Sequence, residues 1–420
     1  MRESSVISLL VFLIIASALS LAYCPSIGGE PNDKAIVGEY PVKAVTKGPK
    51  HHFFGYYDKC PWDKTGRYLL ANEIDFIDRQ PKPGEKLTVG MVDLQDNNRY
   101  IPFDKTAAWC WQQGTILQWL GTAPDREVIY NSIEKGKYVS VIRDVKSGKT
   151  RTLPLPVYDV SEDGTQAVTL DFARLNRLRP GYGYATLPEQ FKNDPAPKQL
   201  GIWHMDTKTG KNKLIVSLHQ LANNQADERF KGAYHWVNHL LFNPSGTRVI
   251  FLHRWSRKPR GWYTRLYTVN PDGTDLRLVI DTGMVSHFDW KDDHTILAWS
   301  RTKKQGDHFY LFDERNGDAT VTGANILKRD GHCSYSPNRK WILNDTYPDK
   351  QRMQTLMVLR ANDLKRFDLG KFFLPRKLTG PFRCDLHPRW NRDGTQICFD
   401  SGHGPTRQMY VVDVSKLVTK

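Results

Sequence analysis

The sequence lacks the marks of several common protein classes. Its six cysteines are irregularly spaced and form no CxxC pair, which argues against a zinc ribbon or a dense disulfide scaffold. An exported chain could still pair two of them. No Gly-x-Ser-x-Gly motif is present, so the nucleophile elbow of many hydrolases is missing. No long helical pattern occurs, and beyond residues 6–22 no apolar run is long enough to span a membrane.

The apolar run at residues 6–22 predicts a secretory signal. It follows a basic N-terminus and ends in small residues suited to cleavage, so we assign residues 1–22 to a signal peptide. An uncleaved membrane anchor is the alternative, because the run is nearly of bilayer length. We expect a flexible linker at 23–35 and a catalytic domain at 36–420. The protein is then exported, periplasmic or secreted, without stable membrane insertion after signal cleavage. Lipoprotein anchoring through Cys24 is not expected, since a tyrosine precedes it.

The net charge indicates the kind of partner. Lysine and arginine (60) outnumber aspartate and glutamate (45), which gives a net charge of +15. A basic exported protein favours polyanionic partners. Outside the cytoplasm an acidic polysaccharide or oligosaccharide is the better candidate, and we expect no nucleic-acid partner. Simple solubility is the alternative explanation of the same charge.

A strand–turn–strand pattern repeats along the chain. Each copy joins two apolar stretches through a short polar turn, which suits a tight hairpin. Further strand pairs lie between the copies. Four strands in each of seven units predict an all-β fold, a seven-bladed β-propeller, because blades packed around an axis bury both faces of every sheet. The seven copies span residues 62–72, 123–131, 161–170, 243–252, 291–299, 336–344 and 391–399.

Two segments fall outside the repeat. The last unit is one strand short, and residues 36–46 could supply an outer strand that closes the ring. Residues 171–196 form a long interruption, which we expect to be a surface loop, and such loops often carry function.

Histidines occupy the same place in four consecutive repeats, a few residues before the hairpin turn. The first strand of a propeller blade lines the central channel, so these imidazoles are expected to converge there. Imidazole is the commonest metal-ligating side chain near neutral pH, and the carboxylate of Asp385 could join it. The alternative is that a repeat places like residues at like positions without function. Against it, the first three units have no histidine at this place. The four residues are His239, His287, His332 and His387.

Arginine, tyrosine and further histidine residues are predicted to gather near this cluster. Aromatic rings stack on sugar faces, and guanidinium groups bind carboxylate or sulfate in a bidentate manner, so the set suits an acidic sugar. Packing between blades is the alternative for each aromatic. The predicted substrate-binding residues are Arg177, Arg179, Tyr182, Arg254 and His52, and the predicted catalytic residues beside His239 are His253 and Tyr184.

Segments that carry these histidines resemble the seven-bladed polysaccharide lyases, notably oligogalacturonate lyases and, more loosely, ulvan lyases. They are HLLFNP from His239, HFDW from His287 and DLHPRW from Asp385, and WQQG at 111–114 is similar too. The resemblance spans most of residues 50–415. It implies a lyase that cleaves a uronic-acid-containing poly- or oligosaccharide by metal-assisted β-elimination.

The resemblance also implies roles for individual residues. His239 would be the base, and His287 and His387 would bind a divalent metal ion, with Mn²⁺ implied and Zn²⁺ or Ca²⁺ as alternatives. The family's last metal-binding segment carries a Gln and two His, whereas this chain lacks the Gln and has Asp385 at one His position. Asp385 and His332 are therefore added to the predicted metal ligands.

Two other functions stay open. A non-catalytic periplasmic propeller, acting as a binding or scaffold module, would share the repeat without needing four axial histidines. A glycoside hydrolase would need two carboxylates that face one site. Asp171, Asp345 and Asp400 end second strands and could face the channel in that way.

Overall fold

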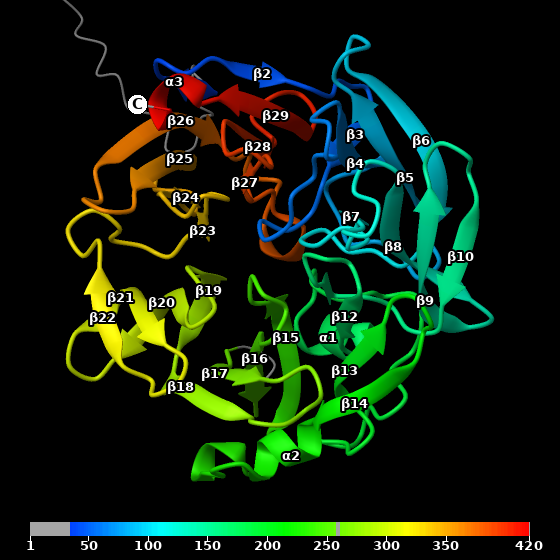
Figure 1. The fold of residues 1–420 in the computed structure, drawn as a ribbon, viewed down its shortest axis with the longest axis vertical. Coiled ribbons are helices and arrows are strands. Elements are labelled where there is room, and N and C mark those ends of the chain that lie inside the picture. The colour runs from blue at the N-terminus through cyan, green and yellow to red at the C-terminus, as the bar shows by residue number, and fades with distance from the viewer. Residues whose placement is uncertain (1–33, 258–260, 420) are drawn as a thin grey trace, which may run out of the picture.

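Seven antiparallel sheets stand in a ring (Figure 1), which confirms the all-β, seven-bladed propeller. The computed structural model describes residues 34–257 and 261–419. The predicted signal peptide and nearly all of the predicted linker lie outside these residues. Among the residues described, no helix has the length and apolar character needed to cross a membrane.

The strands follow the chain from blade to blade. The first three blades consist of β3 (His51–Phe53), β4 (Tyr68–Ile74), β5 (Leu87–Asp93) and β6 (Arg99–Thr106); of β7 (Gln118–Trp119), β8 (Glu127–Glu134), β9 (Lys137–Asp144) and β10 (Thr150–Leu153); and of β11 (Asp159–Val160), β12 (Gln166–Thr169), β13 (Gly201–Asp206) and β14 (Asn212–Ser217). The fourth and fifth consist of β15 (Tyr234–Phe242), β16 (Val249–Ser256), β17 (Tyr263–Val269) and β18 (Arg277–Gly283); and of β19 (Val285–Trp290), β20 (Thr295–Thr302), β21 (Gly306–Asp313) and β22 (Ala319–Thr322). The sixth and seventh consist of β23 (Ser334–Tyr335), β24 (Trp341–Asp345), β25 (Met353–Arg360) and β26 (Arg366–Phe373); and of β27 (Arg389–Trp390), β28 (Gln396–Ser401) and β29 (Gln408–Asp413).

The predicted turn copies join the first strand of each blade to the second. Glycine stands at the same turn position in four of them, with φ between +70° and +76°. A residue with a Cβ is strained in that left-handed conformation, so glycine fixes these hairpins. The four are Gly66, Gly164, Gly246 and Gly394. Apolar side chains between neighbouring sheets form the core: β16 is buried along almost its whole length, whereas β10 exposes three of its four residues.

The N-terminal segment closes the ring, as predicted, but through fewer residues than expected. Strand β2 (Val42–Ala44) pairs with β29 and completes the seventh blade. Strand β1 (Ala35–Val37) pairs instead with β26 and adds a fifth strand to the sixth blade. Pro41 has no backbone N–H to donate to a ladder, which favours a break between the two strands.

The prediction of a surface loop at 171–196 holds only for the second part of the segment. Helix α1 (Phe172–Leu178) lies in the first part, and the Asp171 carboxylate caps it by accepting a hydrogen bond from the Arg174 N–H. Tyr182 and Tyr184 in the same segment are buried. Aromatic side chains pack the first part of the insertion into the protein, whereas several residues between Pro188 and Pro195 stay exposed in irregular backbone.

Short helices complete the structure. They are α2 (Leu218–Asn223), η1 (Glu228–Phe230), η2 (Gly380–Phe382) and α3 (Ser415–Val418). The five cysteines within the described ranges are all free thiols, so none of them forms a disulfide with another.

Candidate functional site

The four aligned histidines belong to the innermost strands of blades four to seven or lie just before them. His239 is in β15 and His287 is in β19, each where the pairing register shifts, between Asn238 and Leu241 and between Val285 and Phe288. Such bulges re-aim a side chain away from the regular pleat. His239 and His387 also have positive φ, +53° and +41°. Strained backbone of this kind gathers at functional sites.

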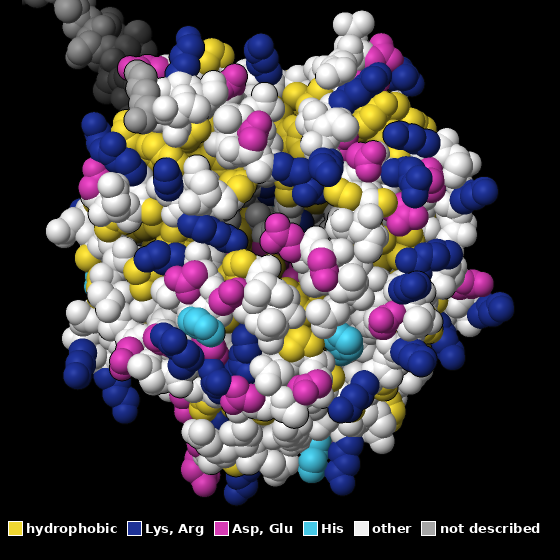
Figure 2. All heavy atoms as spheres, viewed as in Figure 1, with side chains coloured by type: hydrophobic (Ala, Val, Ile, Leu, Met, Phe, Trp, Pro, Cys, Tyr) yellow, Lys and Arg dark blue, Asp and Glu magenta, His cyan; other side chains and the backbone are white. Residues whose placement is uncertain are grey.

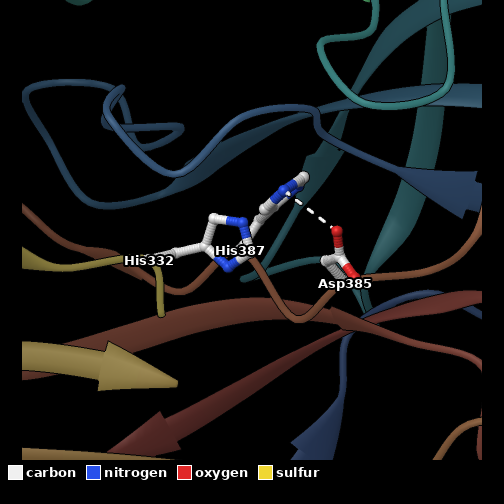
Figure 3. Close-up of side chains that lie close together, drawn as sticks. All are labelled: His332, Asp385 and His387. Atoms are coloured by element: carbon white, nitrogen blue, oxygen red, sulfur yellow. Dashed lines mark ion pairs between the residues drawn. The ribbon is translucent and has the colours of Figure 1, made fainter. Parts of the chain in front are cut away.

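His332, Asp385 and His387 come together as a buried group that could hold a metal ion (Figure 3). One ligand atom from each lies within 4.8 Å of the others. The Nδ1 of His332 is 2.9 and 3.0 Å from the two Asp345 oxygens, and the Nδ1 of His387 is 2.9 Å from the Gly55 carbonyl oxygen. Both Nε2 atoms are buried and have no hydrogen-bond partner in the described part of the chain.

The two imidazoles of the group differ in their pKa. Burial, together with the charge of His332, lowers the pKa of His387 well below its ordinary value, so its imidazole is neutral. The pKa of His332 is raised, because the Asp345 carboxylate outweighs the effect of burial, so a metal ion at this site would displace a proton from that ring. Asp385 forms an ion pair with Arg383 at 2.7 Å. Two imidazoles whose second nitrogens are held by a carboxylate or a carbonyl, beside a carboxylate, are a usual ligand set for a divalent transition metal. The residues therefore fit such an ion.

His287 and His239 stand outside this group. The Nδ1 of His287 is 2.9 Å from Asp330 Oδ1, and its ring centroid is 4.2 Å from that of His332. The Nε2 of His239 is 3.5 Å from an Asp58 oxygen, and its Nδ1 is buried without a described partner. Burial lowers the pKa of His239 to about 4 although Asp58 opposes that shift. Its imidazole is therefore neutral at neutral pH.

A cavity of about 230 Å³ lies against these two histidines. Arg254 and Arg179 line it, and no described carboxylate pairs with either guanidinium. Arg254 is only 7% exposed, and burial together with the Arg179 charge lowers its pKa to about 10. The Arg179 guanidinium lies 4.3 Å from the ring centroid of Trp262 and 4.7 Å from that of Tyr182. Two neighbouring arginines without a counterion form a site for an anion.

The metal-binding group sits directly behind the wall of this cavity. Its three residues are not among those that line the cavity, but Tyr56 and Tyr347 are. The ring centroid of Tyr56 is 5.0 Å from that of His387, and the ring centroid of Tyr347 is 5.6 Å from that of His332. An ion held there would be one side chain away from a molecule in the cavity.

Four predicted site residues lie away from the cavity. His253 is fully buried against His235, with 2.9 Å between Nε2 and Nδ1, and Tyr184 accepts a hydrogen bond from Asn131. The other two are held by neighbouring side chains: Arg177 by Glu189, and His52 by Gln408 and Glu73. Repeat position and composition alone could not separate these residues from those in the cavity, because the repeat pattern does not show which side chain each of them contacts.

The three carboxylates that a hydrolase could use are all engaged. Asp171 caps α1, Asp345 binds His332, and Asp400 is within 3.0 Å of both Arg389 and Arg407. None of the three lines the cavity that holds the arginine pair.

Replacing Asp400 by Ala is expected to destabilise the protein by about 3–5 kcal/mol, because Arg389 and Arg407 would become buried charges without the counterion that they share. Denaturant unfolding followed by circular dichroism measures the change. As a matched control, D307A breaks the exposed Arg301–Asp307 pair and is expected to cost less than about 1 kcal/mol. Equal effects in the two variants would contradict the assignment of Asp400 to a structural role.

Several residues of the site were missed from the sequence. Tyr56, Tyr57 and Asp58 lie in the link between β3 and β4, which runs into the centre of the ring: the ring centroid of Tyr57 is 5.4 Å from that of His239. The sequence signal for these residues is the aromatic stretch HHFFGYYDK, which lies in an unusually long link between the first and second strands of the first blade. Asp330 and Tyr347 give no comparable signal.

Comparison with known proteins shows the fold. No family model and no curated protein matches the chain. Two solved oligogalacturonate lyase structures are similar. One, in complex with manganese, is 16% identical, covers 92% of this chain and 99% of its own, and has a TM-score of 0.65. The other, from Vibrio parahaemolyticus, is 15% identical, covers 90% of this chain and 98% of its own, and has a TM-score of 0.63. The propeller domain of the trilobed protease from Pyrococcus furiosus is also similar, at 10% identity, 86% and 95% coverage, and a TM-score of 0.50. Similarity at such low sequence identities shows a shared propeller fold and does not show a shared function.

Proposed function

We propose that this protein is a polysaccharide lyase that cleaves a uronic-acid-containing poly- or oligosaccharide by metal-assisted β-elimination. The observation that carries the proposal is the unpaired Arg254–Arg179 couple in a cavity that also borders His239 and adjoins the metal-binding group. A sugar carboxylate supplies the negative charge that the two arginines lack. The solved oligogalacturonate lyase in complex with manganese shares the propeller fold, so the fold is compatible with this function.

The substrate is held by charge and by stacking. Arg254 and Arg179 bind the carboxylate of one sugar unit through charge-assisted hydrogen bonds. Trp262, which is 39% exposed at the cavity, and Tyr182 offer aromatic faces to a sugar ring. Lys and Arg side chains are scattered among acidic ones over the face of the ring shown in Figure 2, so this face carries no continuous basic surface.

His239 acts as the base. The Asp58 carboxylate, 3.5 Å from Nε2, favours the tautomer that carries its proton on Nε2, which leaves the Nδ1 lone pair to take the proton from the carbon next to the carboxylate. The electron pair of that C–H bond forms the new double bond, and the bond to the leaving oxygen breaks. The proton that His239 has taken returns to the leaving oxygen, which departs as an alcohol, so the base is regenerated and the proton count is unchanged. His332, Asp385 and His387 would hold a divalent ion, whose positive charge near the cavity would stabilise the negative charge that develops on the sugar carboxylate.

We also propose that the protein is exported. A signal peptide at 1–22 would place the enzyme in the periplasm or outside the cell, where acidic polysaccharides are found. The chain would remain free of the membrane after signal cleavage.

The purified protein is expected to release unsaturated product, followed by its ultraviolet absorbance, from at least one of oligogalacturonides, pectate and ulvan. Chelation should abolish the activity and added Mn²⁺ should restore it, because the positive charge at the channel is lost and regained. Absence of product from every uronate polymer would reject the lyase. Binding of a polymer without cleavage would favour a non-catalytic binding module.

A further inference from the structure

Two neighbouring histidines have the same local arrangement but face different surroundings. His287 and His332 each place Nδ1 2.9 Å from a carboxylate oxygen, of Asp330 and of Asp345 respectively. Their ring centroids are 4.2 Å apart. A carboxylate at Nδ1 accepts the ring N–H and leaves Nε2 as the nitrogen with a lone pair. The surroundings of Nε2 then distinguish the two residues.

The free nitrogen of His332 belongs to the metal-binding group. It is buried without a hydrogen-bond partner among the described residues, and His332 joins Asp385 and His387 in the one group whose ligand atoms lie within 4.8 Å of one another. His332 does not line the cavity. Its carboxylate partner Asp345 is fully buried as well.

His287 belongs to the cavity instead. Both His287 and Asp330 line it, and His287 does not join the metal-binding group. The Nε2 of His287 is not among the buried nitrogens that lack a partner, in contrast to the Nε2 atoms of His332 and His387. Asp330 keeps 22% of its side chain exposed. This pair is thus part of the wall that a bound molecule touches.

We propose that His287, held in place by Asp330, contacts the substrate and is not a metal ligand. With Nδ1–H donated to Asp330, the Nε2 lone pair accepts a hydrogen bond from a hydroxyl group of the sugar in the cavity. The metal ligands are then His332, Asp385 and His387. The identity of the bound molecule as a sugar acid rests on the proposed function, whereas the exclusion of His287 from the metal site does not.

The first test measures metal binding in the absence of any substrate. Apo protein is titrated with Mn²⁺ by calorimetry for the wild type and for H332Q, D345N, H287Q and D330N. D345N is expected to weaken Mn²⁺ binding by roughly 10- to 100-fold as an outer partner of a ligand, and H332Q by more than that. H287Q and D330N should stay within about threefold of the wild type, because only an unbound neighbour is changed. Loss of Mn²⁺ binding in H287Q equal to that in H332Q would overturn the proposal.

The second test measures contact with substrate at saturating Mn²⁺. H287Q is expected to reduce kcat/KM on the cleaved uronate oligomer by roughly 3- to 10-fold or more, the worth of one hydrogen bond. Unchanged kcat/KM would overturn the contact. A wild-type protein that cleaves no uronate would sink the proposed function, while the Mn²⁺ titration would still decide whether His287 is a ligand. Thermal melting of each variant confirms that the ring is folded.

Discussion

Replacement of His239 by Asn is expected to lower kcat/KM on a uronate oligomer by about 10²- to 10⁴-fold, the usual contribution of a positioned general base. Asn is the suitable substitution because the residue has φ +53°, a conformation that Asn tolerates and Ala does not. The variant therefore removes the imidazole without adding backbone strain. Steady-state rates of unsaturated product formation give the change.

The pH profile separates loss of the base from a general defect. Burial lowers the pKa of His239 to about 4, and the base acts only when unprotonated. Wild-type kcat/KM should therefore be high above that pH and fall as the pH drops through about 4. In the His239→Asn variant this acidic limb should disappear from the residual rate. H52Q, which changes a buried histidine outside the cavity, is the matched control and should keep both rate and profile. An acidic limb that persists in the variant would assign the base to another residue.

The fold could be predicted because its signals are local. A few adjacent residues determine each hairpin turn, as at Gly164 and Gly246, and seven such turns along one chain leave few architectures open. The position of His332 and His387 near one another followed from the same repeat, since equivalent places in neighbouring blades face one axis. In a repeat protein, local sequence patterns therefore predict contacts between residues that are far apart in the chain.

The roles of the individual side chains could not be predicted in this way. Asp330 and Asp345 are separated from the histidines they hold by 43 and 13 residues, and nothing in the repeat marks them. The bulge at His287 is a break in the register and not in the sequence pattern. Tyr184 and Tyr182 lie two residues apart in the same insertion, yet only Tyr182 reaches the cavity. Such differences arise from packing, which a single sequence does not reveal.

Replacement of Arg254 by Met is expected to weaken binding of a sugar acid by roughly 30-fold or more, because the lost interaction is a buried, charge-assisted one. Met keeps the length and apolar stem of Arg254, which is 7% exposed, and removes only the charged head. KM for the uronate oligomer and the dissociation constant of a saturated uronate product both measure the change.

The stability of the same variant makes the prediction specific. A residue that maintains the fold through its charge would destabilise the protein when neutralised. Arg254 has no carboxylate partner and lies near the like charge of Arg179, so R254M should leave the unfolding free energy unchanged or raise it. Binding and stability are then expected to move in opposite directions, the mark of a charge kept for a ligand. R177M, which changes an arginine of the neighbouring insertion that is already paired with Glu189, should leave KM within about twofold, since it makes no new space or charge in the cavity. A fall in stability with unchanged binding in R254M would show that this arginine serves the propeller and not an acidic sugar.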